Sequence, residues 1–243
     1  MIHMLNAPSI FGLSHILYVV ITTIAIVCGC IIAKKYCQSE KSKNFVILGS
    51  AIALLVSVSL NRTLNAVYSN LYDEAWHNLL PTTFSGMTSF ILSIFLIINF
   101  KRNKNHPILH GVVYIGIIAG IAATVYPDFL GQASSIFYPP TISSFVHHTL
   151  TLFVVALLFM WGMFKPTFKK WHCFYLALCV YLVAGMFMVH ALGLPSAMEI
   201  YVPILPGLYW YIAGMIVAVL HVVMLTTDYF VRKKFKNNDE AKA

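Results

Sequence analysis

The sequence predicts an all-α, polytopic membrane protein: seven transmembrane helices in one bundle. Composition is the first observation behind this prediction, because 59% of the residues are hydrophobic and only 10% are charged, too few charges for a soluble domain of 243 residues. The second is a series of apolar runs, each about as long as the roughly 20 residues that cross a bilayer. The third is the distribution of basic residues, which alternates from one connection to the next.

The seven runs follow one another with short connections. They cover residues 11–33, 45–69, 79–100, 107–127, 141–164, 172–194 and 204–230. No linker, low-complexity tract or internal repeat separates them. We therefore expect a single domain over residues 1–243.

Basic residues predict the orientation of the bundle, because short loops rich in Lys and Arg stay in the cytoplasm. Fifteen of the 16 lie in the first, third and fifth connections and in the C-terminal tail: Lys34, Lys35, Lys41, Lys43, Lys101, Arg102, Lys104, Lys165, Lys169, Lys170, Arg232, Lys233, Lys234, Lys236 and Lys242. The N-terminus is therefore expected outside and the C-terminus inside. We expect a multi-pass protein of the cell membrane, with no cleaved signal peptide, since no basic segment precedes the first run. The net charge of +8 is explained by topology and anionic lipid, without a nucleic-acid partner.

Arg62 is the one basic residue outside this pattern, in "SLNRTLNAVY" near the outer end of the second run. A charge at this depth is costly. It either faces the bundle interior and marks a functional site, or extends its side chain to the outer headgroups.

Other polar residues converge on the same outer third, when depth is counted along each helix at about 1.5 Å per residue. They are His15, His77, Thr82, Thr83, Ser85, His147, His148, His190, Tyr209 and Trp210. In the third run, Thr82, Ser85, Ser89 and Ser93 are spaced to share one helix face, and hydroxyls in that pattern serve either packing or chemistry. In the fifth run, Ser144, His148 and Thr151 share a face, whereas His147 points about 100° away.

This combination is typical of acyl transfer. A hydroxyl needs a positioned base, usually histidine, to become a nucleophile. We therefore take Ser85 or Thr83 as the candidate nucleophile and His148 or His147 as the base. Arg62, His77 or a backbone N–H would stabilise the oxyanion that forms at an ester carbonyl. Thr82, His15, His190, Tyr209 and Trp210 complete the expected lining.

Several segments resemble the bacterial YwaF-type integral membrane proteins, which are related to the animal transmembrane protein 164 group. The segments are "FGLSHI", "LLPTTFSGMTSF", "YPD", "FVHHTLTL" and "KPTFKKW". The resemblance implies seven helices and an acyltransferase that moves fatty acyl chains between glycerophospholipids through a cysteine and a histidine. The histidine corresponds to His148, with His147 as the alternative. The family pattern has a histidine and then a cysteine after the proline of the third helix, where this chain has Thr83 and Ser85.

That departure leaves three interpretations. Ser85 replaces the cysteine, Thr83 acts as in membrane hydrolases with a threonine nucleophile, or the chemistry is lost and the protein binds a lipid or small ligand. A transporter is a further alternative, favoured by Arg62 and by Gly116 and Gly120 in the fourth run. A zinc hydrolase would use His15, His77, His148 and His190 as ligands, although no two of them have i, i+4 spacing. We expect no cofactor, since the seventh run has no lysine for retinal.

Overall fold

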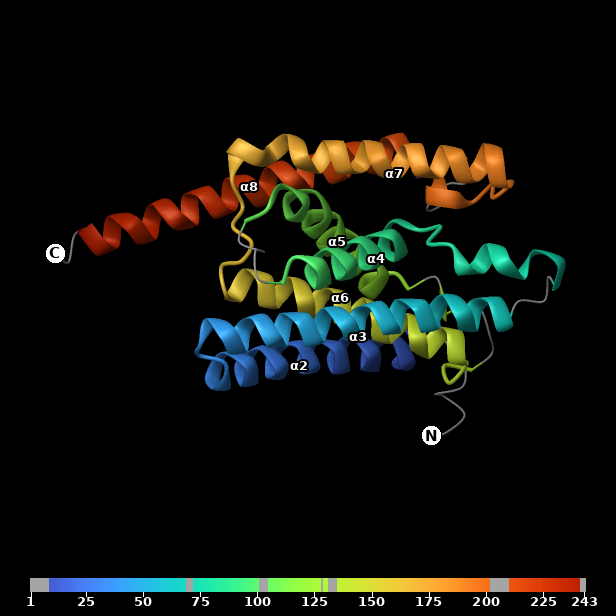
Figure 1. The fold of residues 1–243 in the computed structure, drawn as a ribbon, viewed down its shortest axis with the longest axis horizontal. Coiled ribbons are helices and arrows are strands. Elements are labelled where there is room, and N and C mark those ends of the chain that lie inside the picture. The colour runs from blue at the N-terminus through green and yellow to red at the C-terminus, as the bar shows by residue number, and fades with distance from the viewer. Residues whose placement is uncertain are drawn as a thin grey trace.

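The computed structural model describes residues 9–68, 72–100, 105–127, 129–130, 135–201 and 210–240. Within these ranges the chain forms seven α-helices and no strand (Figure 1). The helices are α2 (Leu13–Tyr36), α3 (Glu40–Val67), α4 (Phe84–Ile98), α5 (Pro107–Val125), α6 (Pro139–Met160), α7 (Trp171–Leu192) and α8 (Trp210–Glu240). Short 3-10 segments are η1 (Tyr72–Leu79), η3 (Phe168–Lys170) and η4 (Ala197–Glu199). The predicted all-α, seven-helix fold is confirmed.

Six of the helices are long and apolar enough to cross a membrane, and α4 is shorter, with 15 residues. It begins at Phe84 rather than near residue 79, because Thr83 is its N-cap. The Thr83 backbone is extended, and its hydroxyl accepts a hydrogen bond from Gly86 N at 3.1 Å. Thr82 therefore precedes the helix, and the expected four-residue polar face is reduced to Ser85, Ser89 and Ser93.

Helices α4 and α5 lie between one group formed by α2, α3 and α6 and a second group formed by α7 and α8 (Figure 1). Helix α3 packs against both α6 and α4, while α5 packs against α7, α4 and α6. The main hydrophobic core lies between these helices, where Leu54, Leu92, Val113 and Leu157 are fully buried. The helices that the sequence analysis associated with the site, the second, third and fifth runs, are thus neighbours.

Glycine allows the closest approach between α5 and α7. A Cβ added at Gly111 would lie 2.8 Å from the Ala177 Cβ and 3.1 Å from the Cys173 carbonyl oxygen. Both distances are shorter than van der Waals contact. Small residues that let backbones approach are the usual means of helix association in membranes, where lipid competes for apolar surface.

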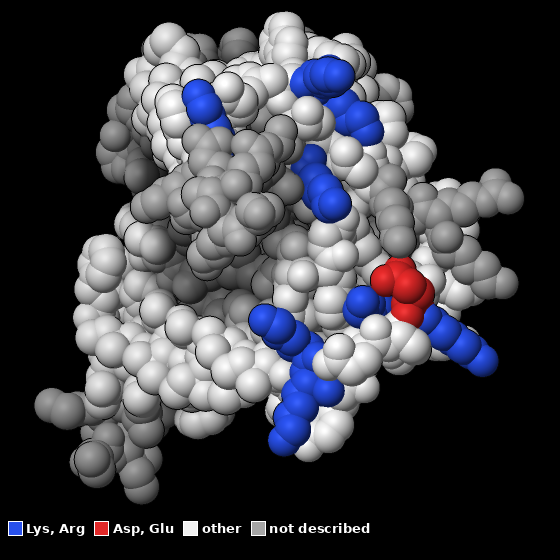
Figure 2. Space-filling model, turned by 90° about the vertical axis from the view of Figure 1, so that its left-hand side faces the viewer, with Lys and Arg blue, Asp and Glu red and all other residues white. Residues whose placement is uncertain are grey.

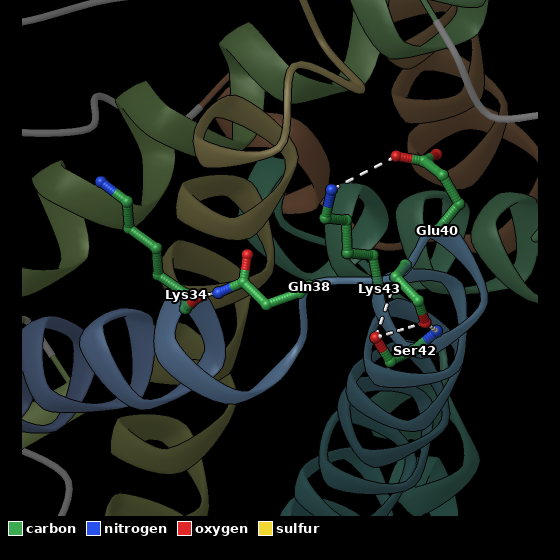
Figure 3. A network of polar contacts seen from close by, with 6 residues as sticks. Lys34, Gln38, Glu40, Ser42 and Lys43 are labelled. Carbon is green, nitrogen blue, oxygen red and sulfur yellow. Dashed lines mark hydrogen bonds and ion pairs between the residues drawn. The ribbon is translucent and has the colours of Figure 1, made fainter.

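Lys and Arg side chains gather at the end of the bundle where α2 ends and α3 and α7 begin (Figure 2). A tight turn joins α2 to α3 at this end. The Ser39 hydroxyl accepts a hydrogen bond from Ser42 N at 3.0 Å, and Lys43 pairs with Glu40 at 3.3 Å (Figure 3). The basic first and fifth connections therefore share one end, as the alternating pattern requires. The orientation of that end in the membrane stays a prediction.

Candidate functional site

The candidate site lies where α3 contacts α6 and α4. Four buried side-chain atoms at this contact have no hydrogen-bond partner: Asn61 Oδ1, Arg62 Nε, His147 Nε2 and His148 Nδ1. They come from two adjacent residues on α3 and two on α6. An unsatisfied buried polar group costs about 1–3 kcal/mol, so the presence of four of the nine such atoms of the described residues at this one contact points to a ligand or to chemistry there.

Asn61 connects α3 to α6. Its side chain is fully buried, and its amide nitrogen donates hydrogen bonds to Ser143 Oγ and Ser144 Oγ, both at 2.9 Å, and to the Pro140 carbonyl at 3.3 Å. Ser143 and Ser144 lie one helical turn before His147 and His148. Asn61 thereby fixes the position of the histidine pair relative to α3. Asn61 was not among the residues predicted from the sequence, although its place beside Arg62 in an apolar run was a signal.

Arg62 lies against the first turn of α4. One guanidinium nitrogen is 3.6 Å from the position that a Cβ on Gly86 would occupy. The side chain is half-buried and has no ion-pair partner within the described ranges. A cation beside a helix N-terminus adds to the positive end of the helix dipole, so the two together favour an anionic group.

The rings of His147 and His148 are in contact, with centroids 4.0 Å apart, and both side chains are buried. His147 Nδ1 lies 3.4 Å from the Ser143 carbonyl oxygen. A carbonyl only accepts, so this contact places the proton on Nδ1 and leaves a lone pair on Nε2. His148 instead stacks on Phe129, at 5.6 Å between centroids and an interplanar angle of 15°. His147 therefore has the orientation of a general base, with one nitrogen held and the other free.

A hydrogen bond between hydroxyls sets the alignment of α4 with α6. Ser89 Oγ and Thr151 Oγ1 are 2.8 Å apart, and each also lies within hydrogen-bond distance of a carbonyl one turn earlier on its own helix, Ser85 or His147. Since a hydroxyl has a single proton, one of the two donates across to the other helix and the other donates to its own backbone. Both helices run from the same end of the bundle. Ser85 and His147 therefore occupy corresponding positions, one turn nearer the start of each helix than this contact. Ser85 Oγ and His147 Nε2 are not hydrogen-bonded in this structure.

The two candidate nucleophiles differ in what their hydroxyls already do. Thr83 Oγ1 caps α4, as described above. The Ser85 hydroxyl is half-buried and has one contact, with Thr83 Oγ1 at 3.3 Å. A hydroxyl bound to a helix N-terminus is needed for the fold, so Ser85 is the freer of the two.

The other expected lining residues have separate surroundings. His15 is buried, accepting a hydrogen bond from Phe11 N at 2.9 Å and lying 2.8 Å from the Thr124 carbonyl, so both ring nitrogens are engaged. His190 is exposed and contacts the Tyr201 hydroxyl at 3.1 Å.

The remaining predicted lining residues that the structure describes are His77, Thr82 and Trp210, while Tyr209 lies outside the described residues. His77 lies in η1, with its ring centroid 3.8 Å from that of Trp76. The Thr82 carbonyl accepts a hydrogen bond from Met198 N. Trp210 begins α8.

The four histidines of the zinc alternative do not assemble. In the described part of the chain, no group of three His, Cys, Asp or Glu side chains is placed to hold a metal ion. Both ring nitrogens of His15 have the hydrogen-bond partners given above, and His190 contacts the Tyr201 hydroxyl. The described residues therefore give the zinc alternative no support.

Comparison with known proteins adds one finding. A model of the TMEM164 family matches residues 10–227, which include every helix that forms the candidate site. No curated protein and no solved structure matches the chain.

Proposed function

The chain belongs to the TMEM164 family, and from that premise we propose that it is an enzyme within the membrane that transfers or hydrolyses the acyl chains of phospholipids. In a multi-pass membrane protein, a site between the helices is surrounded by lipid, the proposed substrate. The unpartnered atoms of Asn61, Arg62, His147 and His148 carry the proposal. A bundle stabilised only by packing has no need to bury these four groups together without partners.

We assign Ser85 as nucleophile and His147 as its base. Ser85 is half-buried and free of the helix cap, and His147 Nε2 is the unpartnered nitrogen one turn before the Ser89 and Thr151 contact. His148 lies against His147 and is the alternative base. Catalytic hydrogen bonds in unliganded sites are often long, so formation of the Ser85 to His147 bond is expected on lipid binding.

The chemistry follows from these positions. His147 Nε2 takes the Ser85 proton as Oγ attacks the ester carbonyl of a phospholipid. The oxyanion that forms lies beside the Arg62 guanidinium and the first N–H groups of α4. Collapse breaks the ester bond, and the proton on His147 passes to the departing lysolipid oxygen. The acyl-serine then reacts with a second lysolipid hydroxyl in transfer, or with water in hydrolysis, and His147 acts as base again.

The assay is transfer of a labelled acyl chain between phospholipids by purified protein in nanodiscs, with heat-denatured protein as blank. We expect Ser85→Ala to abolish transfer and His147→Ala to lower the rate about a hundredfold or more. Ser93→Ala is the matched control. Ser93 is a buried serine two turns further along the same helix, with its hydroxyl bonded to the Phe90 carbonyl. It should transfer at the wild-type rate.

Two results would contradict the proposal. One is full transfer by Ser85→Ala. The other is a wild-type protein that binds phospholipid but releases no acyl chain from any donor, which would favour ligand binding without catalysis.

A further inference from the structure

The segment between α7 and residue 201 contains an unusual backbone. We call residues 194–200 the strap; it follows Gly193, the C-cap of α7, and includes η4. Met198 has φ +51° and Glu199 has φ +48°, in the left-handed region that L residues with a Cβ seldom adopt. Two consecutive non-glycine residues in this region persist only where the surroundings hold them.

The strap is held in place by the buried side chain of Met198 and by the hydrogen bond of its backbone N–H. The side chain is fully buried, and Met198 N donates to the Thr82 carbonyl at 2.7 Å, just before α4 begins. On the other side, α7 approaches so closely that a Cβ on Gly185 would lie 2.8 Å from Met198 Cβ and 2.7 Å from Ile200 Cδ1. The strap is therefore seated against both α4 and α7.

Met198 belongs to a hydrophobic cluster that joins the approach to α4, α4 itself, α7 and the strap, and we call the space that its side chain fills the slot. The residues of this cluster and those packed against it include Leu80, Phe84, Met87, Leu182, Met188 and Leu194. Phe84 lies between the two candidate nucleophiles in sequence, so the slot adjoins the turn that carries Ser85. An unbranched methionine has the shape and flexibility of a short alkyl chain.

We propose that Met198 is a removable plug, and that a lipid acyl chain occupies this slot when the strap lifts. The proposal rests on the proposed function, for which it supplies the place of the acyl chain beside Ser85. Acyl chains are the surrounding medium of a transmembrane bundle, and they match a slot lined by leucine, phenylalanine and methionine. The strained backbone of Met198 and Glu199 lowers the stability of the closed strap, which favours its release.

The test is photolabelling in nanodiscs with a phosphatidylcholine that carries a diazirine in one acyl chain, with labelled residues identified by mass spectrometry. Met198→Ala shortens the plug, so labelling of Phe84, Met87 and Leu182 should rise severalfold over wild type. Met215→Ala is the control, because Met215 is an exposed methionine on α8. It should leave slot labelling unchanged. Slot labelling that is the same in Met198→Ala and in wild type overturns the proposal.

A second pair of variants keeps Met198 and tests whether slot labelling falls when the closed strap is stabilised. Glu199→Gly removes the steric cost of positive φ and stabilises the closed strap, so slot labelling should fall about fivefold or more. Glu199→Ala loses the same carboxylate but keeps the strained φ, and it should not reproduce that fall. If Glu199→Gly is labelled in the slot as strongly as Glu199→Ala, or more strongly, the proposal that Met198 is a removable plug is contradicted.

Photolabelling needs no catalysis, which separates this proposal from the proposed function. Ser85→Ala should keep the wild-type labelling pattern and should respond to Met198→Ala in the same way. If transfer assays show no acyl chemistry while slot labelling follows the variants as described, the proposed reaction fails and the acyl slot stands.

Discussion

Substitution of Gly185 by alanine measures how tightly the strap is packed against α7. An added Cβ would lie 2.7 Å from Ile200 Cδ1 and 2.8 Å from both Cβ and Cγ of Met198. Carbon atoms in normal contact are about 3.5–4.0 Å apart, so the strap or α7 has to move by about an ångström. Met198 Cβ is fixed to the backbone and cannot rotate away.

The expected effect on the free energy of unfolding has two opposing parts. Overpacking of this kind typically costs about 1–3 kcal/mol. Alanine is favoured over glycine inside a helix by about 1 kcal/mol, which offsets part of that cost. Gly49→Ala is the matched variant: Gly49 lies inside α3, and a Cβ there meets nothing within 4 Å. The difference between the two variants isolates the steric cost, about 1–3 kcal/mol.

The assay is reversible unfolding in mixed micelles as the SDS fraction rises, followed by circular dichroism. Gly49→Ala should be at least as stable as wild type, and Gly185→Ala should be less stable than Gly49→Ala by the steric cost. Equal stability of the two variants would show that the strap does not press on α7, and would refute the packing on which the plug is based.

Three further predictions concern the site and the topology. Asn61→Ala should lower the free energy of unfolding by about 1–2 kcal/mol, because interhelical hydrogen bonds in membranes average about 0.6 kcal/mol each and the two amide protons of Asn61 are shared among three acceptors on α6. Asn65→Ala, which loses a bond within α3, should change it by less, and equal losses would exclude the interhelical role. Thr83→Ala should lower the free energy of unfolding by about 1 kcal/mol, because the N-cap of α4 is lost, while acyl transfer persists. Loss of acyl transfer without loss of stability would instead make Thr83 the nucleophile. A single cysteine at Lys41 in a cysteine-free protein should react with an impermeant maleimide only after cells are permeabilised, and labelling of intact cells would reverse the orientation.

The helices were predictable from the sequence because each apolar run has the length of a bilayer crossing. The start of α4 was not, since it depends on Thr83 and its hydrogen bond to Gly86 N, a choice among several hydroxyls in the same stretch. Hydropathy counts residues over a window and does not identify an N-cap.

The residue types of the candidate site were predictable from the sequence, but the hydrogen-bond partners of those residues were predictable only in part. Arg62, Ser85 and the histidine pair were identified because each is polar at its depth. Asn61 was missed because its partners lie 79 to 83 residues away on α6. His15 was expected in the lining, and the partners of its ring nitrogens, Phe11 N and the Thr124 carbonyl 109 residues away, were not foreseen. Contacts of this kind depend on tertiary packing, which periodicity does not contain.

The left-handed backbone of the strap had no sequence signal. Positive φ is usually marked by glycine or asparagine, and here it falls on Met198 and Glu199. Burial of Met198 and its bond to Thr82 compensate the strain, and both depend on segments far apart in the sequence.

The most direct test of the lipid chemistry is to find the acyl group on the protein. Purified protein in nanodiscs is incubated with a phospholipid that carries an isotopically labelled acyl chain, quenched in acid, digested and analysed by peptide mass spectrometry. We expect a labelled acyl ester on Ser85 that is absent from Ser85→Ala and that a lysolipid acceptor removes. Acyl transfer that proceeds with the ester on Thr83, or with the acyl group on one of the five cysteines, would contradict it.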